Sequence, residues 1–193
     1  MSTVVKFGGS LLGSPERDGL LAEAARAGAI VVPGGGPFAD AVRAAQPRLG
    51  FGAGAAHAMA ILAMEQTARA LADLHPALAP CGDAAAFAAA RARGRGAIWL
   101  PAAMALAAPL PASWDVTSDS LSLWLAATLG ADRLVLLKSD GAEGGPQDWA
   151  KAELVDPYFP RLAEAFAGEI ALVGPATRAA LAVALASPVR RAA

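Results

Sequence analysis

The first ten residues constrain the fold most strongly, because a short apolar strand runs directly into glycine and serine. Residues 3–7 are rich in β-branched side chains, which is typical of a buried strand, and Gly8, Gly9 and Ser10 follow at once. Lys6 lies near the end of this strand. Small residues after a strand leave backbone N–H groups free to face an anion, and the lysine adds a positive charge beside them. The stretch therefore predicts either an anion-binding loop or an ordinary β-turn.

A second strand runs into three successive glycines. Residues 29–33 predict another buried strand, and Gly34, Gly35 and Gly36 separate it from the start of a helix. Each glycine costs conformational entropy on folding, and a plain turn needs only one or two. We therefore expect the backbone of these glycines to lie close to a bound ligand, with a structural turn as the alternative.

Composition narrows the class of protein. The chain of 193 residues fits a single domain with a sizeable core. It is 55% hydrophobic, but Gly, Pro or a charged residue interrupts every apolar run, so we expect no membrane span. A formal net charge of −1 argues against nucleic acid as a partner. The one cysteine, Cys81, excludes an internal disulfide framework and, without a secretory signal, favours the cytoplasm.

Strands and helices alternate along the whole chain. We expect strands at 3–7, 29–33, 97–100, 133–137 and 169–173. Helices are expected over 14–28, from the 34–36 loop, over 55–74, 83–93, 117–130 and 159–167, and after 174–175, with a flexible loop at 142–148. This alternation predicts an α/β fold, a three-layer αβα sandwich around a mainly parallel sheet. Ligands bind such sheets at the carboxyl ends of the strands.

Two polar stretches supply further candidate residues. Thr117 or Ser118 suits the N-cap of a helix, and Asp119 lies in its first turn, where the helix dipole stabilises negative charge. A cap needs one such residue, yet residues 117–120 are all hydroxyl or carboxyl residues. Further on, Lys138 closes a strand and meets a turn, as Lys6 does.

His57 has two interpretations. It lies near the start of the expected helix 55–74, near the side that carries Ile61, Met64 and Glu65. In the first interpretation this side packs in the core or against a second copy, with His57 at its polar margin. In the second, His57 faces the substrate cleft. We expect the helix to pair across a two-fold axis in a homodimer or higher homo-oligomer.

Four motifs in this order resemble those of the amino acid kinase family, and they span nearly the whole chain. They are Val5-Lys6-Phe7-Gly8-Gly9-Ser10, Val32-Pro33-Gly34-Gly35-Gly36, Thr117-Ser118-Asp119-Ser120 and Lys138-Ser139-Asp140-Gly141. Within that family, residues 33–39 and 113–123 most resemble the aminomethylfuran phosphate kinases of methanofuran biosynthesis. Relatives of those kinases occur in methylotrophs, which use a methanofuran-like carrier in formaldehyde oxidation.

The resemblance implies an ATP-dependent phosphotransferase that uses Mg²⁺ and acts on a small phosphorylated substrate. It implies catalytic roles for Lys6, Asp119 and Lys138. The nucleotide phosphates would be bound by Gly8, Gly9, Ser10, Lys138, Asp140 and Gly141, and the acceptor by Gly34, Gly35, Gly36, His57, Thr117 and Ser118. Asp119 would either orient a lysine or interact with Mg²⁺. The acceptor half would cover about 1–115 and the nucleotide half about 116–193 of one domain.

The chain also departs from known kinase patterns. It has no Gly-x-x-x-x-Gly-Lys-Ser/Thr motif, which excludes a P-loop kinase. Ala142-Glu143 stands where the family has Val-Tyr, and we expect the chain to end at Ala193 without a final strand that many members have. Our leading hypothesis is a kinase that converts aminomethylfuran phosphate to its diphosphate. The alternatives are a kinase for another acceptor, such as an acyl group or nucleoside monophosphate, and a weakly active or inactive kinase-fold binding or regulatory protein.

Overall fold

The strands of the sheet all run parallel, in the order β3-β4-β2-β1-β5-β6. The computed structural model describes residues 2–189. The strands are β1 (Thr3–Phe7), β2 (Ile30–Pro33), β3 (Leu78–Cys81), β4 (Gly96–Trp99), β5 (Arg133–Leu137) and β6 (Glu169–Val173). The chain leaves β1 toward β2 on one side and later returns to its other side as β5. The expected α/β fold is therefore confirmed.

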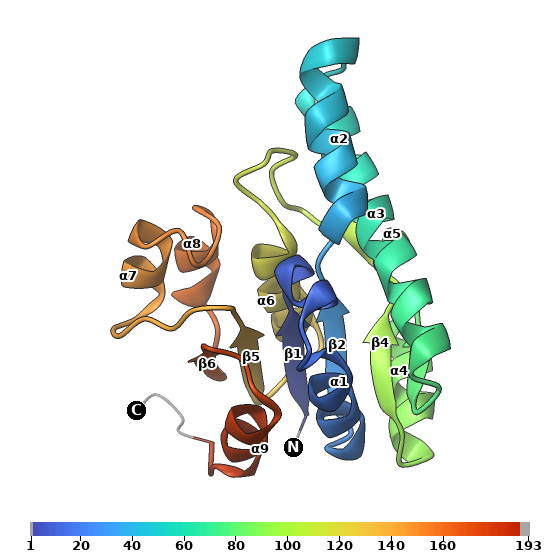
Figure 1. The fold of residues 1–193 in the computed structure, drawn as a ribbon, viewed down its shortest axis with the longest axis vertical. Helices are drawn as coiled ribbons and strands as arrows, with labels where there is room; N and C mark the ends of the chain where they lie inside the picture. The colour runs from blue at the N-terminus through green and yellow to red at the C-terminus, as the bar shows by residue number, and fades with distance from the viewer. Residues whose placement is uncertain (1, 190–193) are drawn as a thin grey trace.

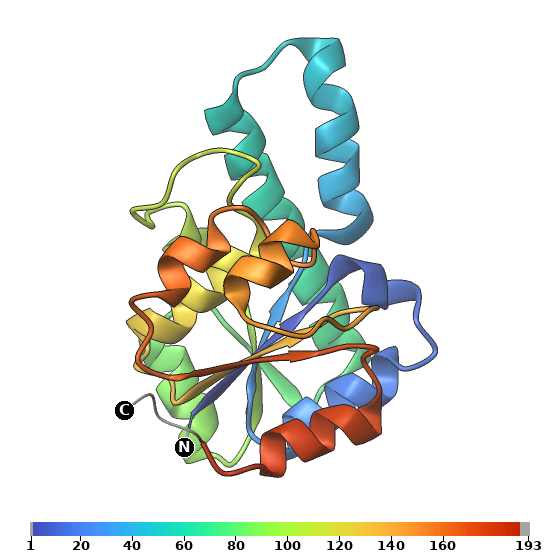
Figure 2. The same cartoon turned by 90° about the vertical axis from the view of Figure 1, so that its left-hand side faces the viewer.

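Helices cover both faces of this sheet (Figures 1 and 2). They are η1 (Gly9–Gly13, a 3₁₀ turn), α1 (Arg17–Arg26), α2 (Gly36–Leu49), α3 (Ala53–Leu74), α4 (Ala84–Ala92), α5 (Ala102–Ala105), α6 (Ser118–Thr128), α7 (Pro146–Lys151), α8 (Phe159–Ala163) and α9 (Arg178–Ala186). The core on one face contains residues of α1, α9 and the end of α3, and the core on the other contains residues of α4, α6 and α8. The molecule thus has the three layers that the sequence predicts.

Successive side chains of β1 point to opposite faces of the sheet. Val5 and Phe7 pack in the core beneath α1 and α9, while Val4 packs in the core beneath α6. Lys6 follows Val4 by two residues and therefore points to the α6 side. Lys138 follows Leu136 of the neighbouring strand in the same way. Both strand-ending lysines are thus directed to the same helix.

Helices α2 and α3 form a long hairpin that extends beyond the end of the sheet (Figure 2). Gly50 ends α2 in the left-handed conformation, with a φ of 75°, which glycine adopts without strain. Helix α3 covers the range expected from the sequence. Leu49, Met59 and Leu62 are exposed apolar side chains of this hairpin. No helix within residues 2–189 is both long and apolar enough to cross a membrane.

Several boundaries differ from the predictions. Helix α1 begins at Arg17, because the Ser14 hydroxyl accepts a hydrogen bond from the Glu16 N–H and forms a turn before the helix. The 142–148 segment is not wholly a loop, since α7 starts at Pro146 and buries Trp149. Helix α8 is shorter than expected. Strand β3 was not predicted, and the expectation for the chain end at Ala193 lies outside the described residues.

Candidate active site

Three charged side chains meet at the carboxyl edge of the sheet. The Nζ atom of Lys6 lies 2.7 Å from Oδ1 of Asp119, and Nζ of Lys138 lies 2.9 Å from both carboxylate oxygens. Lys6 belongs to β1, Lys138 follows the adjacent β5, and Asp119 lies in the first turn of α6. All three side chains are largely buried. We call this arrangement the Lys-Asp-Lys cluster.

The protonation of this cluster follows from burial and from its own charges. Burial opposes the charged form of Asp119, but the two ammonium groups outweigh it and lower the pKa of the carboxyl. Burial, together with repulsion from Lys6, lowers the pKa of Lys138 to about 8, although Asp119 acts in the opposite direction. With both lysines protonated, the cluster has one more positive charge than negative charges. It can therefore attract an anion.

A buried aspartate that the sequence did not indicate holds the start of α6. Asp156, in the segment between α7 and α8, accepts hydrogen bonds from the backbone N–H groups of Thr117, Ser120 and Phe159. The hydroxyls of Thr117 and Ser120 donate to it as well. Of the two candidate caps, Thr117 is the N-cap of α6, and its hydroxyl accepts a weak hydrogen bond from the Asp119 N–H. Asp156 thus fixes the turn that carries Asp119.

The glycine loops after β1 and β2 pack backbone against backbone. The N–H of Gly34 donates to the carbonyl of Phe7 over 2.8 Å. A Cβ atom on Gly34 would lie 2.6 Å from the Gly9 nitrogen, and one on Gly9 would lie 2.8 Å from the Gly36 nitrogen. The sequence pattern assigned the three glycines to close approach of a ligand. The structure gives an additional reason for two of the loop glycines, since any side chain at Gly34 or Gly9 would push the two loops apart.

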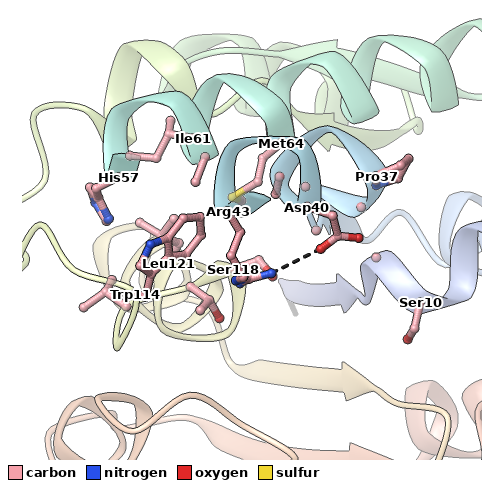
Figure 3. A pocket seen from close by; sticks show the side chains of 18 residues that line it. Ser10, Pro37, Asp40, Arg43, His57, Ile61, Met64, Trp114, Ser118 and Leu121 are labelled. Atoms are coloured by element: carbon pink, nitrogen blue, oxygen red, sulfur yellow. Dashed lines mark hydrogen bonds and ion pairs between the residues drawn. The ribbon is translucent and has the colours of Figure 1, made fainter. Parts of the chain in front are cut away.

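A cavity of about 450 Å³ lies beside these loops (Figure 3). The predicted site residues that line it are Gly9, Ser10, Gly34, Gly35, Gly36, His57, Thr117 and Ser118. Apolar side chains of α3 and α6, namely Ile61, Met64 and Leu121, complete one wall. Burial lowers the pKa of His57, so its imidazole is neutral at pH 7. Of its two interpretations, the structure favours the one in which His57 faces a cleft.

Three residues of the cavity wall were not singled out from the sequence. Trp114 is held in place on two sides, because its indole N–H donates to Gln46 over 2.7 Å and the Arg43 guanidinium lies 4.4 Å from its ring centroid. Arg43 in turn donates to Asp40 over 3.1 Å, as the dashed line in Figure 3 shows. The side chains of Arg43 and Asp40 are more than half exposed, so this ion pair contributes little stability and remains available to a ligand.

The remaining predicted residues are not part of the cavity wall. In the described part of the chain, Gly8, Asp140 and Gly141 are not among its lining residues, and neither are the three residues of the Lys-Asp-Lys cluster. Asp140 and Gly141 form an exposed turn that packs against Gly174 after β6. The hydroxyl of Ser10 lies 3.3 Å from that of Ser139 and joins the two sides. The cluster adjoins both in the chain, because Asp119 follows Ser118 of the cavity wall and Lys138 precedes the turn after β5.

The contacts of the Asp119 carboxylate argue against a magnesium ion bound directly to it. Both oxygens of its carboxylate already accept from ammonium groups, and a divalent cation there would be repelled by both. Within residues 2–189, no group of three or more His, Cys, Asp or Glu side chains is arranged to hold a metal ion. Of the two roles considered for Asp119, orientation of the lysines fits this geometry better.

The fold and site define a doubly wound α/β protein with an anion-attracting cluster at the carboxyl edge of its sheet. A profile of the amino acid kinase family matches residues 1–141, and the chain belongs to that family. The structure is similar to uridylate kinase from Archaeoglobus fulgidus, with 18% identity, a TM-score of 0.72 and 98% of each chain covered. UMP kinase from Ureaplasma parvum gives 15% identity and a TM-score of 0.64, covering 91% of this chain and 90% of that one. Isopentenyl phosphate kinase gives 16% identity and a TM-score of 0.58, covering 96% of each.

Similarity at these identities shows the fold alone. A comparison with curated protein sequences found no match.

Proposed function

We propose that this protein transfers the γ-phosphoryl group of ATP to a small acceptor bound in the cavity. The observation that carries the proposal is the Lys-Asp-Lys cluster, in which Asp119 directly follows the cavity residue Ser118 and Lys138 directly precedes the turn at 139–141. The transferring group is strongly anionic, and the protein's task in such a reaction is positioning and charge stabilisation. A buried cluster with a surplus positive charge suits that task.

In the proposed reaction the acceptor oxygen forms a bond to the γ-phosphorus while the bond from that phosphorus to the ADP oxygen breaks. Lys6 and Lys138 stabilise the charge on the phosphoryl oxygens, and Asp119 keeps both ammonium groups oriented and favours the charged form of Lys138. Backbone N–H groups of Gly8, Gly9 and Ser10 bind the nucleotide phosphates. Mg²⁺ bound with ATP supplies further charge neutralisation on those phosphates.

The acceptor we favour is aminomethylfuran phosphate, whose product would be the diphosphate used to build a methanofuran-type carrier. Its phosphate suits the glycine end of the cavity, at the N-terminus of α2. A flat ring fits beside the rigid Trp114, and the Asp40 carboxylate offers a partner for an aminomethyl cation. The likeness to UMP kinases and isopentenyl phosphate kinase supports a phosphate, rather than a carboxylate, as the accepting group.

The test is ADP release with MgATP and a panel of acceptors that includes aminomethylfuran phosphate, UMP and isopentenyl phosphate. We expect turnover with the first. Asp40→Asn should then raise the KM for this amine-bearing acceptor about tenfold without changing the KM for ATP. Preference for UMP or isopentenyl phosphate would overturn the choice of acceptor and keep the kinase.

One observation favours a second function, a binding or regulatory protein on a kinase fold. The family profile ends at residue 141, so α7, α8 and β6 lie beyond the matched part. Tight binding of a phosphorylated ligand with no turnover of any acceptor would support this function and reject the first.

We also propose that two copies pair through α3 and that the protein acts in the cytoplasm. The exposed apolar side chains Met59 and Leu62 on α3 support pairing, and the single free Cys81 suits a reducing compartment. Sedimentation of the purified protein as a monomer would remove the dimer from the proposal.

A further inference from the structure

Asp156 is a buried side chain outside the Lys-Asp-Lys cluster that accepts five hydrogen bonds. Its Oδ2 accepts from the Thr117 N–H over 2.8 Å, from the Thr117 hydroxyl over 2.8 Å and from the Ser120 N–H over 3.0 Å. Its Oδ1 accepts from the Ser120 hydroxyl over 2.5 Å and from the Phe159 N–H over 2.9 Å. Asp156 is only 6% exposed. These donors are neutral, so a buried negative charge is held by hydrogen bonds and by the N-terminus of α6.

These bonds reach further than an ordinary helix cap. An ordinary N-cap is the residue just before its helix, and its side chain accepts from an N–H group of the first turn. Asp83 caps α4 in this way by accepting from the Ala86 N–H. Helix α6 has such a cap in Thr117. Asp156 binds the residues on both sides of Asp119 from another segment, 39 residues later in the chain at the Thr117 bond. A second, external clamp is therefore present at the turn that carries the cluster.

The clamp also joins two parts of the site. Thr117 and Ser118 line the cavity, and the next residue, Asp119, bridges both lysines. On the other side, the Phe159 N–H ties Asp156 to the first residue of α8. The Tyr158 N–H also donates to the carbonyl of Asp115, over 3.2 Å, just before α6. The segment before α8 is therefore bonded directly to the start of α6 and the residues just before it.

We propose that Asp156 is the positioning residue that holds Asp119 between Lys6 and Lys138 and keeps the cavity wall at Thr117 and Ser118 in register with it. An asparagine at this position has one accepting oxygen, and its NH₂ group would face N–H and hydroxyl donors. The turn must then retreat from residue 156. Lys6 stays in place because it belongs to a central strand, so Lys138 loses its carboxylate and keeps the repulsion of Lys6.

The chain offers a direct readout, because its lysines are Lys6, Lys138 and Lys151 alone. Carbon-13 labelling of lysine gives three side-chain signals to follow by NMR as the pH is raised. Lys151 is 78% exposed and serves as an internal reference. In the wild type Lys138 titrates at a pKa of about 8, facing Lys6 from β1 and Asp119 from α6. In Asp156→Asn its pKa should fall further, while Lys151 stays unchanged.

The kinetic arm rests on the proposed function and uses ADP release. Asp156→Asn should lower kcat on the order of 10²-fold, because a misplacement of about 1 Å at a reacting centre has that effect. Asp83→Asn is the matched control, since it makes the same substitution at a helix cap remote from the site and should leave kcat and the Lys138 titration unchanged. If Asp156→Asn does not fold, Ser120→Ala removes one donor, keeps the carboxylate, and should move the same two readouts in the same direction.

The kinetic experiment and the lysine titration test different claims. No turnover by the wild type would overturn the kinase function, and the lysine titration would still test the positioning. A folded Asp156→Asn variant in which Lys138 titrates as in the wild type, or higher, would overturn the positioning role. A kcat for Asp156→Asn that falls no more than that of Asp83→Asn would overturn it as well.

Discussion

The lowered pKa of Lys138 predicts how the free energy of unfolding changes with pH. Its ordinary pKa of 10.5 applies in the unfolded chain, and burial beside Lys6 lowers the value to about 8 in the folded protein. Between those two pH values the unfolded state binds more protons than the folded state, so stability rises with pH. Below about pH 8 both states hold the proton, and the residue adds no slope. At 1.36 kcal/mol for each unit of pKa, the full rise is about 3 kcal/mol.

The perturbation is Lys138→Met, which keeps the length of the side chain and removes its charge. Urea unfolding followed by tryptophan fluorescence, between about pH 7 and about pH 10.5, gives the free energy of unfolding of both proteins. The wild type should gain about 3 kcal/mol relative to the variant across this range. Lys151→Met is the control, because it removes an exposed ammonium group and should leave the wild-type slope intact. Parallel curves for the wild type and Lys138→Met would refute the assigned electrostatics.

Two further substitutions test the site itself. Lys6→Ala should lower kcat about 10²- to 10³-fold with the fold retained by circular dichroism, because it removes charge stabilisation of the transferring group; undiminished transfer would reject Lys6 as a catalytic residue. Gly34→Ala should reduce the free energy of unfolding by about 1–3 kcal/mol, since its Cβ would lie 2.6 Å from the Gly9 nitrogen. Gly13→Ala, which has open space around its Cβ, should be nearly neutral in the same urea experiment.

The strands other than β3 and the cluster residues were the most predictable features, because each has a local signal. Lys6 and Lys138 both close apolar strands, and parallel strands end at the same edge of a sheet. Asp119 lies in the first turn of a helix with a clear N-cap. The three side chains meet on one face of the sheet because side chains alternate between faces along β1 and β5. The meeting also requires β1 and β5 to be neighbours, which the sequence does not show.

The clamp and the cavity wall could not be predicted, because their contacts are tertiary. Asp156 stands in an irregular segment, and nothing near it in sequence indicates donors 36 to 39 residues away. Trp114 and Gln46 come from different parts of the chain and meet only when the 106–117 connection folds over α2. Strand β3 was missed because its four residues include Pro80, which is tolerated at the edge of a sheet but weakens the strand pattern.

Because the Lys-Asp-Lys cluster has a surplus positive charge, binding of an anion should be linked to protonation of Lys138. Two buried ammonium groups share one carboxylate, so one positive charge has no negative partner of its own until an anion binds. A phosphate group beside Lys138 favours its charged form and raises its pKa above about 8. Near that pH the free protein has this lysine about half protonated, so ADP binding should take up about half a proton.

Calorimetry in two buffers of different ionisation enthalpy measures that uptake directly. The apparent binding enthalpy of ADP should depend on the buffer for the wild type and for Lys151→Met, and this dependence should shrink by about half a proton in Lys138→Met. Because the phosphates of ADP have their own titration, only the difference between the proteins is assigned to Lys138. Equal proton uptake in all three would mean that the nucleotide phosphates do not lie beside the cluster. In that case the turn after β5 would not be the nucleotide side of the site.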